Sequence, residues 1–195
     1  MNKLVLYGDS NTYGYDPSGF MGGRYPAEVR WADTLARKLQ GKYMVLNEGM
    51  NGRPLPTLPG DEQFLKSVIG DLTAGDVLLM MLGTNDILLT DHPDADVAIR
   101  KMERLLNYER LTQAAFRFIV VAPPYIGSEE GSMSRYYSES IKMNEGFKKL
   151  CEAHGVEFVD AGTWNVPLAF DLAHLSEEGH RLFAEHLMRM VSIGV

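Results

Sequence analysis

The 195-residue sequence predicts an α/β fold in which a parallel sheet is covered by helices on both faces. Five short apolar runs, each bounded by turn residues, have the continuous hydrophobicity of strands buried on both sides. They alternate with longer segments whose apolar residues recur at helical spacing. Regular alternation of strands and helices favours parallel pairing. The predicted strands are residues 3–7, 43–46, 77–82, 116–122 and 156–159.

The segments between these strands are predicted to be helices. In the first of them, Trp31, Leu35 and Leu39 recur on one face, and Gly41 follows as a C-terminal stop. The last begins at Ser176, a suitable N-cap followed by two glutamates, which are favourable in a first helical turn. The predicted helices are residues 31–39, 61–72, 94–115, 134–154 and 176–193.

Length and composition predict one domain spanning residues 1–195. The net charge of −7 argues against binding to a nucleic-acid backbone. No apolar run approaches the ~20 residues needed to cross a bilayer, and no secretory signal is recognisable. We therefore expect a cytoplasmic protein without a membrane partner. The single cysteine, Cys151, falls in a predicted helix and is expected to be a small core residue.

Polar residues, glycines or prolines follow the first four predicted strands. Ligands of parallel α/β sheets bind beyond the carboxyl ends of the strands, so we expect these segments to meet at one edge. Two loops rich in Gly, Pro and Ser, residues 13–28 and 125–133, fall on the same edge and are expected to shape specificity. The segments that follow the strands are Ser10, residues 47–52, residues 83–86 and residues 123–124.

Gly8-Asp9-Ser10 forms a predicted turn from the first strand into a helix. Ser10 would lie at or near a helix N-terminus, where free backbone N–H groups favour developing negative charge. A serine hydroxyl becomes a good nucleophile when an imidazole accepts its proton and a carboxylate orients that imidazole. Taken alone, however, the motif is better explained by helix capping through Asp9 or Ser10.

Asp171 and His174 can supply the missing imidazole and carboxylate. They are three residues apart just before the last predicted helix, so one loop can present both side chains to Ser10. No H-E-x-x-H motif, cysteine pair or dense carboxylate cluster accompanies them, so metal binding is the weaker interpretation and no metal is predicted. We predict surface or capping positions for the histidines that lack an acid at useful spacing: His92, His154, His180 and His186.

Two other strand ends carry donors suited to a developing oxyanion. Segment 47–53 contains glycines, which allow a peptide N–H to approach a ligand closely, although alone it is more simply an ordinary turn. The amide of Asn85 can donate without carrying charge, and is equally well explained as part of an Asx-turn. The four blocks together, each at the end of a predicted strand or before the last helix, are specific for acyl-transfer chemistry.

These blocks resemble the SGNH/GDSL hydrolase superfamily over essentially the whole chain. The nucleophile block carries Asn11 where leucine is the usual residue. The resemblance implies a flavodoxin-like, three-layer α/β/α sandwich with a five-stranded parallel sheet. The matching blocks are Gly8-Asp9-Ser10-Asn11, Asn47-x-Gly49-x-x-Gly52, Gly83-Thr84-Asn85-Asp86 and Asp171-x-x-His174.

The resemblance also implies a role for each matching residue. Ser10 would be the nucleophile, and His174 the general base oriented by Asp171. The oxyanion hole would consist of the backbone N–H groups of Ser10 and Gly52 together with the side-chain amide of Asn85.

Segments 25–31 and 48–53 look like the arylesterase and acetyl-transferring branch of the superfamily, which acts on short-chain acyl esters and often forms homo-oligomers. We therefore expect a serine esterase that hydrolyses acetyl-type esters through an acyl-enzyme on Ser10, with no cofactor. Arg53 is favoured as a structural residue, and the aromatic candidates are equally well explained by packing. The candidate substrate contacts are Asp9, Asn11, Tyr13, Tyr15, Arg53, Pro124 and Tyr125.

Two alternatives stay open from the sequence. A carbohydrate or peptidoglycan O-acetyl esterase would use the same machinery with a different leaving group. A non-catalytic flavodoxin-like binding module would explain the sheet but not the pairing of Asp171 with His174.

Overall fold

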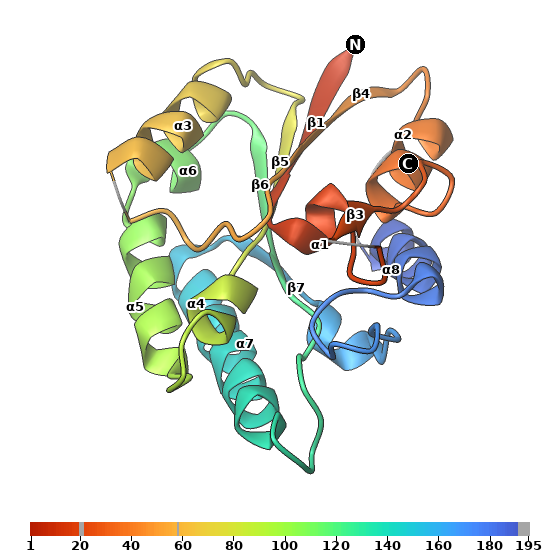
Figure 1. Cartoon of the computed structure of the whole chain (residues 1–195). Helices are drawn as coiled ribbons and strands as arrows, with labels where there is room; N and C mark the ends of the chain where they lie inside the picture. The colour runs from red at the N-terminus through yellow and green to blue at the C-terminus, as the bar shows by residue number, and fades with distance from the viewer. Residues whose placement is uncertain (20–21, 58, 191–195) are drawn as a thin grey trace.

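The computed structural model describes residues 1–19, 22–57 and 59–190, which form three layers (Figure 1). The central sheet has the order β4-β1-β5-β6-β7, and each neighbouring pair is parallel. In chain order this is 2-1-3-4-5, the flavodoxin-like order, so the predicted fold is confirmed. The strands are β1 (Asn2–Gly8), β4 (Tyr43–Gly49), β5 (Val77–Met81), β6 (Arg117–Ala122) and β7 (Glu157–Asp160).

Helices cover both faces of this sheet. Helices α2 and α8 pack on one face, and α3, α5 and α7 pack on the other, where they bury a separate apolar cluster. The helices are α1 (Ser10–Tyr13), α2 (Trp31–Lys38), α3 (Pro59–Gly70), α4 (Thr84–Leu88), α5 (Ala95–Leu106), α6 (Glu109–Thr112), α7 (Ser134–His154) and α8 (Glu177–Met190), with a 3-10 turn η1 (Ala161–Trp164).

Strand β1 shows why the apolar runs are continuous. Successive side chains of a strand point to opposite faces of the sheet. Leu4 and Leu6 join the cluster under α2 and α8, whereas Val5 and Tyr7 join the cluster under α3, α5 and α7. Each of these four residues is at most 2% exposed. Both faces of the strand are therefore apolar because both faces are covered.

Several predicted boundaries differ from the structure by one or two residues, as for α3, which was predicted over 61–72, and three segments differ more. The helix predicted over 94–115 is broken in two: α5 ends at Leu106 with Asn107 as its C-cap, and α6 begins at Glu109. Strand β4 extends three residues beyond its apolar run, because its backbone pairing with β1 continues to Gly49. The predicted loop 13–28 contains a short antiparallel pair, β2 (Tyr15–Asp16) and β3 (Gly23–Arg24).

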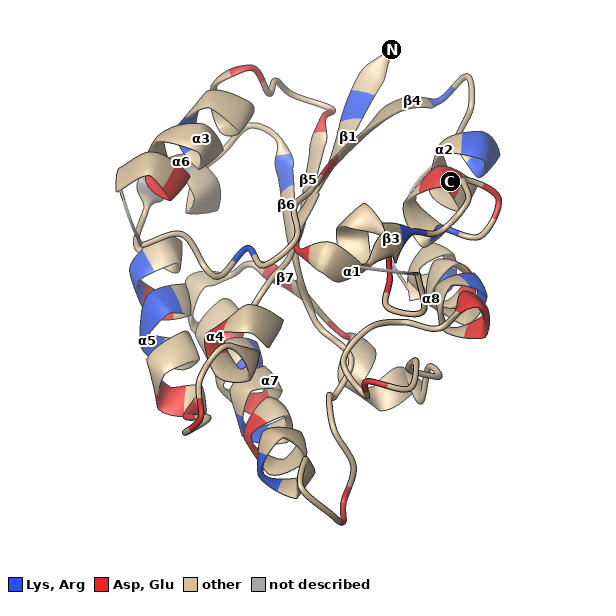
Figure 2. Ribbon diagram, viewed as in Figure 1, with Lys and Arg blue, Asp and Glu red and all other residues tan. Residues whose placement is uncertain are grey.

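The final helix begins close to its prediction. Ser176 caps it, since its hydroxyl accepts a hydrogen bond from the Gly179 N–H at 3.0 Å. The predicted end, residues 191–193, lies outside the described residues. Acidic and basic side chains are mixed along the outer helices, as on α5 and α7 (Figure 2). Among the described residues, no helix combines the length and hydrophobicity needed to span a membrane.

Two buried residues on these helices had sequence predictions. Cys151 is a core residue of α7, as predicted, and burial raises the pKa of its thiol to about 12. The surface or capping position predicted for His180 is wrong, because this residue belongs to the buried face of α8 with Phe183 and Leu187. Burial, reinforced by the positive charges of Arg30 and His174, lowers the pKa of His180 to about 4.

We predict that His180 makes the stability of the protein sensitive to mild acid. The pKa of an unfolded histidine is about 6.5. Between about pH 6.5 and pH 4 the unfolded chain therefore binds a proton that the folded chain does not bind, and the folded state loses stability as the pH falls. Relative to His180→Gln, the wild-type protein should lose about 3 kcal/mol of unfolding free energy across that interval. Urea unfolding of both proteins at pH 7 and pH 4 measures this. A difference between the two proteins that does not change with pH would contradict the prediction.

Candidate active site

Ser10 is the first residue of α1, directly beyond the carboxyl end of β1. The preceding Asp9 is the N-cap, and its Oδ1 accepts a hydrogen bond from the Asn11 N–H at 2.9 Å. Gly49 allows this short helix to lie directly on β4, because a Cβ there would stand 2.2 Å from the Tyr13 nitrogen. Asp9 therefore caps the helix, and the hydroxyl of the neighbouring Ser10 is not needed for capping.

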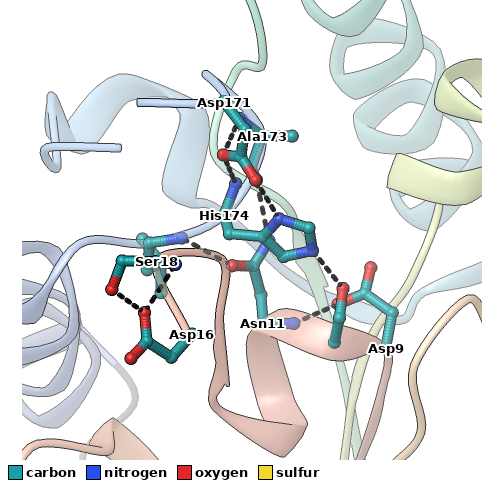
Figure 3. Close-up of polar contacts among 9 residues, drawn as sticks. Asp9, Asn11, Asp16, Ser18, Asp171, Ala173 and His174 are labelled. Carbon is teal, nitrogen blue, oxygen red and sulfur yellow. Dashed lines mark hydrogen bonds and ion pairs between the residues drawn. The ribbon is translucent and has the colours of Figure 1, made fainter. Parts of the chain in front are cut away.

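The structure brings Ser10, His174 and Asp171 together from opposite ends of the chain. His174 Nε2 lies 3.0 Å from Ser10 Oγ, and His174 Nδ1 lies 2.6 Å from Asp171 Oδ2. Figure 3 shows Asp171 on one side of the His174 ring, and Asp9 and Asn11 on the other. When Nδ1–H donates to the carboxylate, Nε2 is left as the acceptor for the hydroxyl proton.

The Asp171–His174 segment is held in shape by its own backbone. Oδ1 of Asp171 accepts the N–H groups of Ala173 and His174, each at 3.1 Å, which leaves Oδ2 for the imidazole. Leu172 has a φ of +56°, an uncommon conformation that this tight turn imposes. Burial raises the pKa of the Asp171 carboxyl, but hydrogen bonds from His174 and Ala173 outweigh it and leave that pKa below its usual value.

Asn85 and Gly52 follow the two strands that flank β1. The Asn85 side chain, on α4, is buried and donates one of its two amide N–H groups to the Arg53 carbonyl at 3.1 Å. Gly52 lies in a turn closed by a hydrogen bond from the Arg53 N–H to the Met50 carbonyl, and its φ of +74° favours glycine.

The contacts of Arg53 agree with a structural role. Its Nη1 donates to the Gly8 carbonyl at 2.9 Å and also to the Glu48 carbonyl, which ties the ends of β1 and β4 together. The guanidinium carbon lies 4.3 Å from the centre of the Tyr7 ring. With 4% of the residue exposed, its polar groups are directed into the protein.

Asp9 is fully buried beneath the site. Burial raises the pKa of its carboxyl to about 6, although the Asn11 N–H and the charge of His174 oppose this shift. A residue without exposed surface has no access to a substrate. Its neighbour Asn11 is also buried, and both polar atoms of its side chain bond to backbone groups beside His174. Both residues therefore support the site from below.

Aromatic residues surround the His174 loop. The Tyr15 ring packs against the His174 ring with 4.6 Å between ring centres. Tyr13 lies under the Arg24 guanidinium, 4.3 Å from its carbon atom. Pro124 and Tyr125 line a cavity of about 320 Å³ beside Leu172, a residue of the His174 loop. Of the aromatic and proline candidates for substrate contact, Tyr15 thus packs on the His174 ring, and Pro124 and Tyr125 line the neighbouring cavity.

Sequence reasoning missed two supporting interactions. The Gly127 N–H donates to the Leu172 carbonyl at 2.7 Å, and nothing in the sequence around Gly127 indicates this pairing. The amide bridge of Asn11 is also missed, although a polar residue in place of the usual leucine is a signal. Within the described residues, no group of three or more His, Cys, Asp and Glu side chains is arranged to hold a metal ion.

Comparisons with known proteins agree with this geometry. The sequence profile of the GDSL-like lipase/acylhydrolase family matches residues 6–182. The chain is similar to the structure of an inferred arylesterase from Agrobacterium tumefaciens str. C58, with 29% identity, a TM-score of 0.81, and coverage of 98% of this chain and 99% of that one.

Two further solved structures have the same fold. A carbohydrate acetylesterase family member from Sinorhizobium meliloti has 26% identity and a TM-score of 0.81, with coverage of 99% of this chain and 98% of that one. An aryl esterase from M. smegmatis has 23% identity and a TM-score of 0.82, with coverage of 98% and 99%. No curated protein sequence matches the chain at a significant level.

The buried carboxyl of Asp9 leads to a prediction about Asp9→Asn. An unfolded aspartate has a pKa of 3.8, so between pH 3.8 and about pH 6 the folded protein holds a proton that the unfolded chain releases. The stability contributed by that proton is lost as the pH rises through this interval. Asn at this position keeps the capping oxygen. We expect Asp9→Asn to gain about 3 kcal/mol of unfolding free energy relative to wild type between pH 4 and pH 7. Unfolding curves at both pH values measure the gain, and an equal difference at the two would contradict it.

Proposed function

Because the chain belongs to the GDSL-like lipase/acylhydrolase family and is therefore a carboxylic ester hydrolase, we propose that it hydrolyses short-chain acyl esters through an acyl-enzyme on Ser10. The observation that carries this proposal is the continuous chain of contacts from Ser10 Oγ through His174 to Asp171. The alternative of a non-catalytic binding module is wrong, since the family is one of hydrolases.

The first step is the attack of Ser10 on the ester carbonyl. His174 Nε2 takes the hydroxyl proton as the new Oγ–C bond forms. Asp171, whose lowered pKa keeps it ionised at neutral pH, fixes the imidazole tautomer and stabilises the imidazolium that results. The tetrahedral intermediate then collapses when the imidazolium returns this proton to the leaving alcohol.

Negative charge on the carbonyl oxygen requires donors that are already in place. We assign this task to the backbone N–H groups of Ser10 and Gly52 and to the second amide N–H of Asn85. Removal of one such donor typically costs about 3 kcal/mol of transition-state stabilisation. The Arg53 carbonyl orients Asn85 by accepting its first N–H, so the second points in a fixed direction.

The second half of the reaction regenerates the enzyme. Water takes the place of the alcohol, His174 accepts a water proton, and the resulting hydroxide attacks the acyl carbonyl. Collapse of the second tetrahedral intermediate breaks the acyl–Oγ bond and returns the proton to Ser10. Transfer of the acyl group to a second alcohol would use the same steps with that alcohol in place of water.

The substrate class is proposed from the neighbouring structures and from the cavity beside the loop. The 29% identical relative is an inferred arylesterase, which favours an ester with an aryl leaving group. A carbohydrate O-acetyl ester is the second candidate, favoured by the 26% identical acetylesterase family member. The cavity next to Leu172 has the tyrosines and an amide that a sugar would contact, namely Tyr125, Tyr137 and Asn165. Cytoplasmic location, self-association and the lack of nucleic-acid binding stay predictions from the sequence.

We predict that Ser10→Ala lowers kcat on p-nitrophenyl acetate by at least ~1000-fold, because it removes the hydroxyl that would form the acyl-enzyme. Ser18→Ala is the matched control, since Ser18 is exposed and, among the described residues, its hydroxyl donates to Asp16 at the end of β2 and not to a residue of the site. A fluorophosphonate probe should label the wild-type protein and Ser18→Ala but not Ser10→Ala. Normal turnover by purified, folded Ser10→Ala would overturn the assignment of the nucleophile.

We also predict a preference for short acyl groups. Among p-nitrophenyl esters, kcat/KM should be highest for acetyl to butyryl and fall by at least about tenfold for dodecanoyl, since the cavity beside Leu172 has a volume of only about 320 Å³. Acetylated monosaccharides and oligosaccharides, assayed for released acetate, separate the two substrate candidates. A kcat/KM that increases steadily to dodecanoyl would rule out the short-chain proposal.

A further inference from the structure

The residue after the nucleophile links the two halves of the site. Asn11 carries a polar side chain, yet only 3% of the residue is exposed. Its Nδ2 donates to the Ala173 carbonyl at 3.1 Å, and its Oδ1 accepts the Leu175 N–H at 2.8 Å. Both distances are those of ordinary hydrogen bonds. The amide therefore pairs with the backbone on both sides of His174, as a neighbouring strand would.

Few other bonds fix the histidine loop, which we define as residues 169–175. The Ala169 N–H donates to the His174 carbonyl at 2.7 Å, and Asp171 binds the backbone of its own turn. In the part of the chain that the structure describes, the remaining hydrogen bonds of the loop go to itself or to Gly127, apart from the contact between His174 and Ser10. Within the described residues, the Asn11 bridge and the contact between His174 and Ser10 are thus the hydrogen bonds that join the loop to α1.

Asn11 itself is held rigidly. Its N–H donates to Asp9, and its carbonyl accepts the indole N–H of Trp31 at 2.8 Å. Trp31 is fully buried between the sheet and α8. A side chain whose backbone is fixed at both groups transmits a defined position to the loop that it binds. Leucine has no polar atom and would leave the Ala173 carbonyl and the Leu175 N–H without these partners.

We propose that Asn11 is a positioning residue, whose amide bridge to Ala173 and Leu175 sets the reach of His174 toward Ser10. The inference rests on the proposed function, because the reach matters only if His174 activates Ser10. A displacement of about 1 Å between reacting groups can reduce a rate by about 100-fold. The bridge does not touch the substrate, so its loss should act on kcat rather than on KM.

The test is Asn11→Leu, assayed well below its melting temperature. We expect kcat on p-nitrophenyl acetate to fall by about 10- to 100-fold with KM within about threefold of wild type. The rate of labelling by the fluorophosphonate probe should fall by a similar factor. Asn11→Asp, which has the same size but faces the Ala173 carbonyl with an oxygen, provides the same measurement if the leucine variant does not fold.

Leu39→Ala controls for a loss of stability alone. Leu39 is buried in the core beside the start of β4, at the end of the sheet opposite Ser10, so this variant should lower the melting temperature and keep kcat. A kcat of Asn11→Leu within threefold of wild type would overturn the proposal. The proposal would also be overturned if Leu39→Ala, at the same loss of stability as Asn11→Leu, lost as much kcat. Ser10→Ala is measured beside them. Activity that survives Ser10→Ala refutes the proposed function, whereas loss in Ser10→Ala with none in the Asn11 variants refutes only the positioning role.

Discussion

Parallel pairing of β1 with both β4 and β5 is the constraint on which the site depends. Gly8 is paired with Gly49 on one side and with Met81 on the other, so three strands end at the same level. After β1 the chain adds β4 on one side of it and then crosses back to add β5 on the other side. The strand order therefore reverses between β1 and β5. Helices diverge from such a point to opposite faces, and the crevice between them accepts ligands.

Close packing at that level explains the glycines better than ligand approach does. A Cβ at Gly8 would stand 2.0 Å from Thr12 Oγ1, and one at Gly49 would meet the backbone of Tyr13. Both glycines are therefore required to seat α1 on the ends of the strands. Gly52 differs, since a Cβ there would meet nothing within 4 Å and only its positive φ favours glycine. The two glycines of segment 47–53 thus have different functions: Gly49 allows close packing with α1, and Gly52 forms an open turn.

The sequence predicted what depends on local pattern and missed what depends on distant partners. Buried strands give apolar runs, so all five strands of the main sheet were predictable. Strand β4 was underestimated because backbone pairing, which has no side-chain signal, extends it through the polar residues Asn47 and Glu48. His180 is polar by type, and only the helical spacing of Phe183 and Leu187 indicates that it faces inward. The Asn11 bridge spans 162 residues and no local pattern encodes it.

The pKa values of two carboxyls near His174 are shifted in opposite directions because their surroundings differ. Asp171 is partly exposed and accepts three hydrogen bonds from its own turn and from the imidazole, so its pKa is lowered and it is ionised at neutral pH. Asp9, which precedes Ser10, is fully buried, and burial raises the pKa of its carboxyl to about 6. The imidazolium formed during attack is therefore stabilised mainly by the carboxylate of Asp171, to which it is hydrogen-bonded. Asp9 contributes mainly through its cap on α1, a role that requires an oxygen and not a charge.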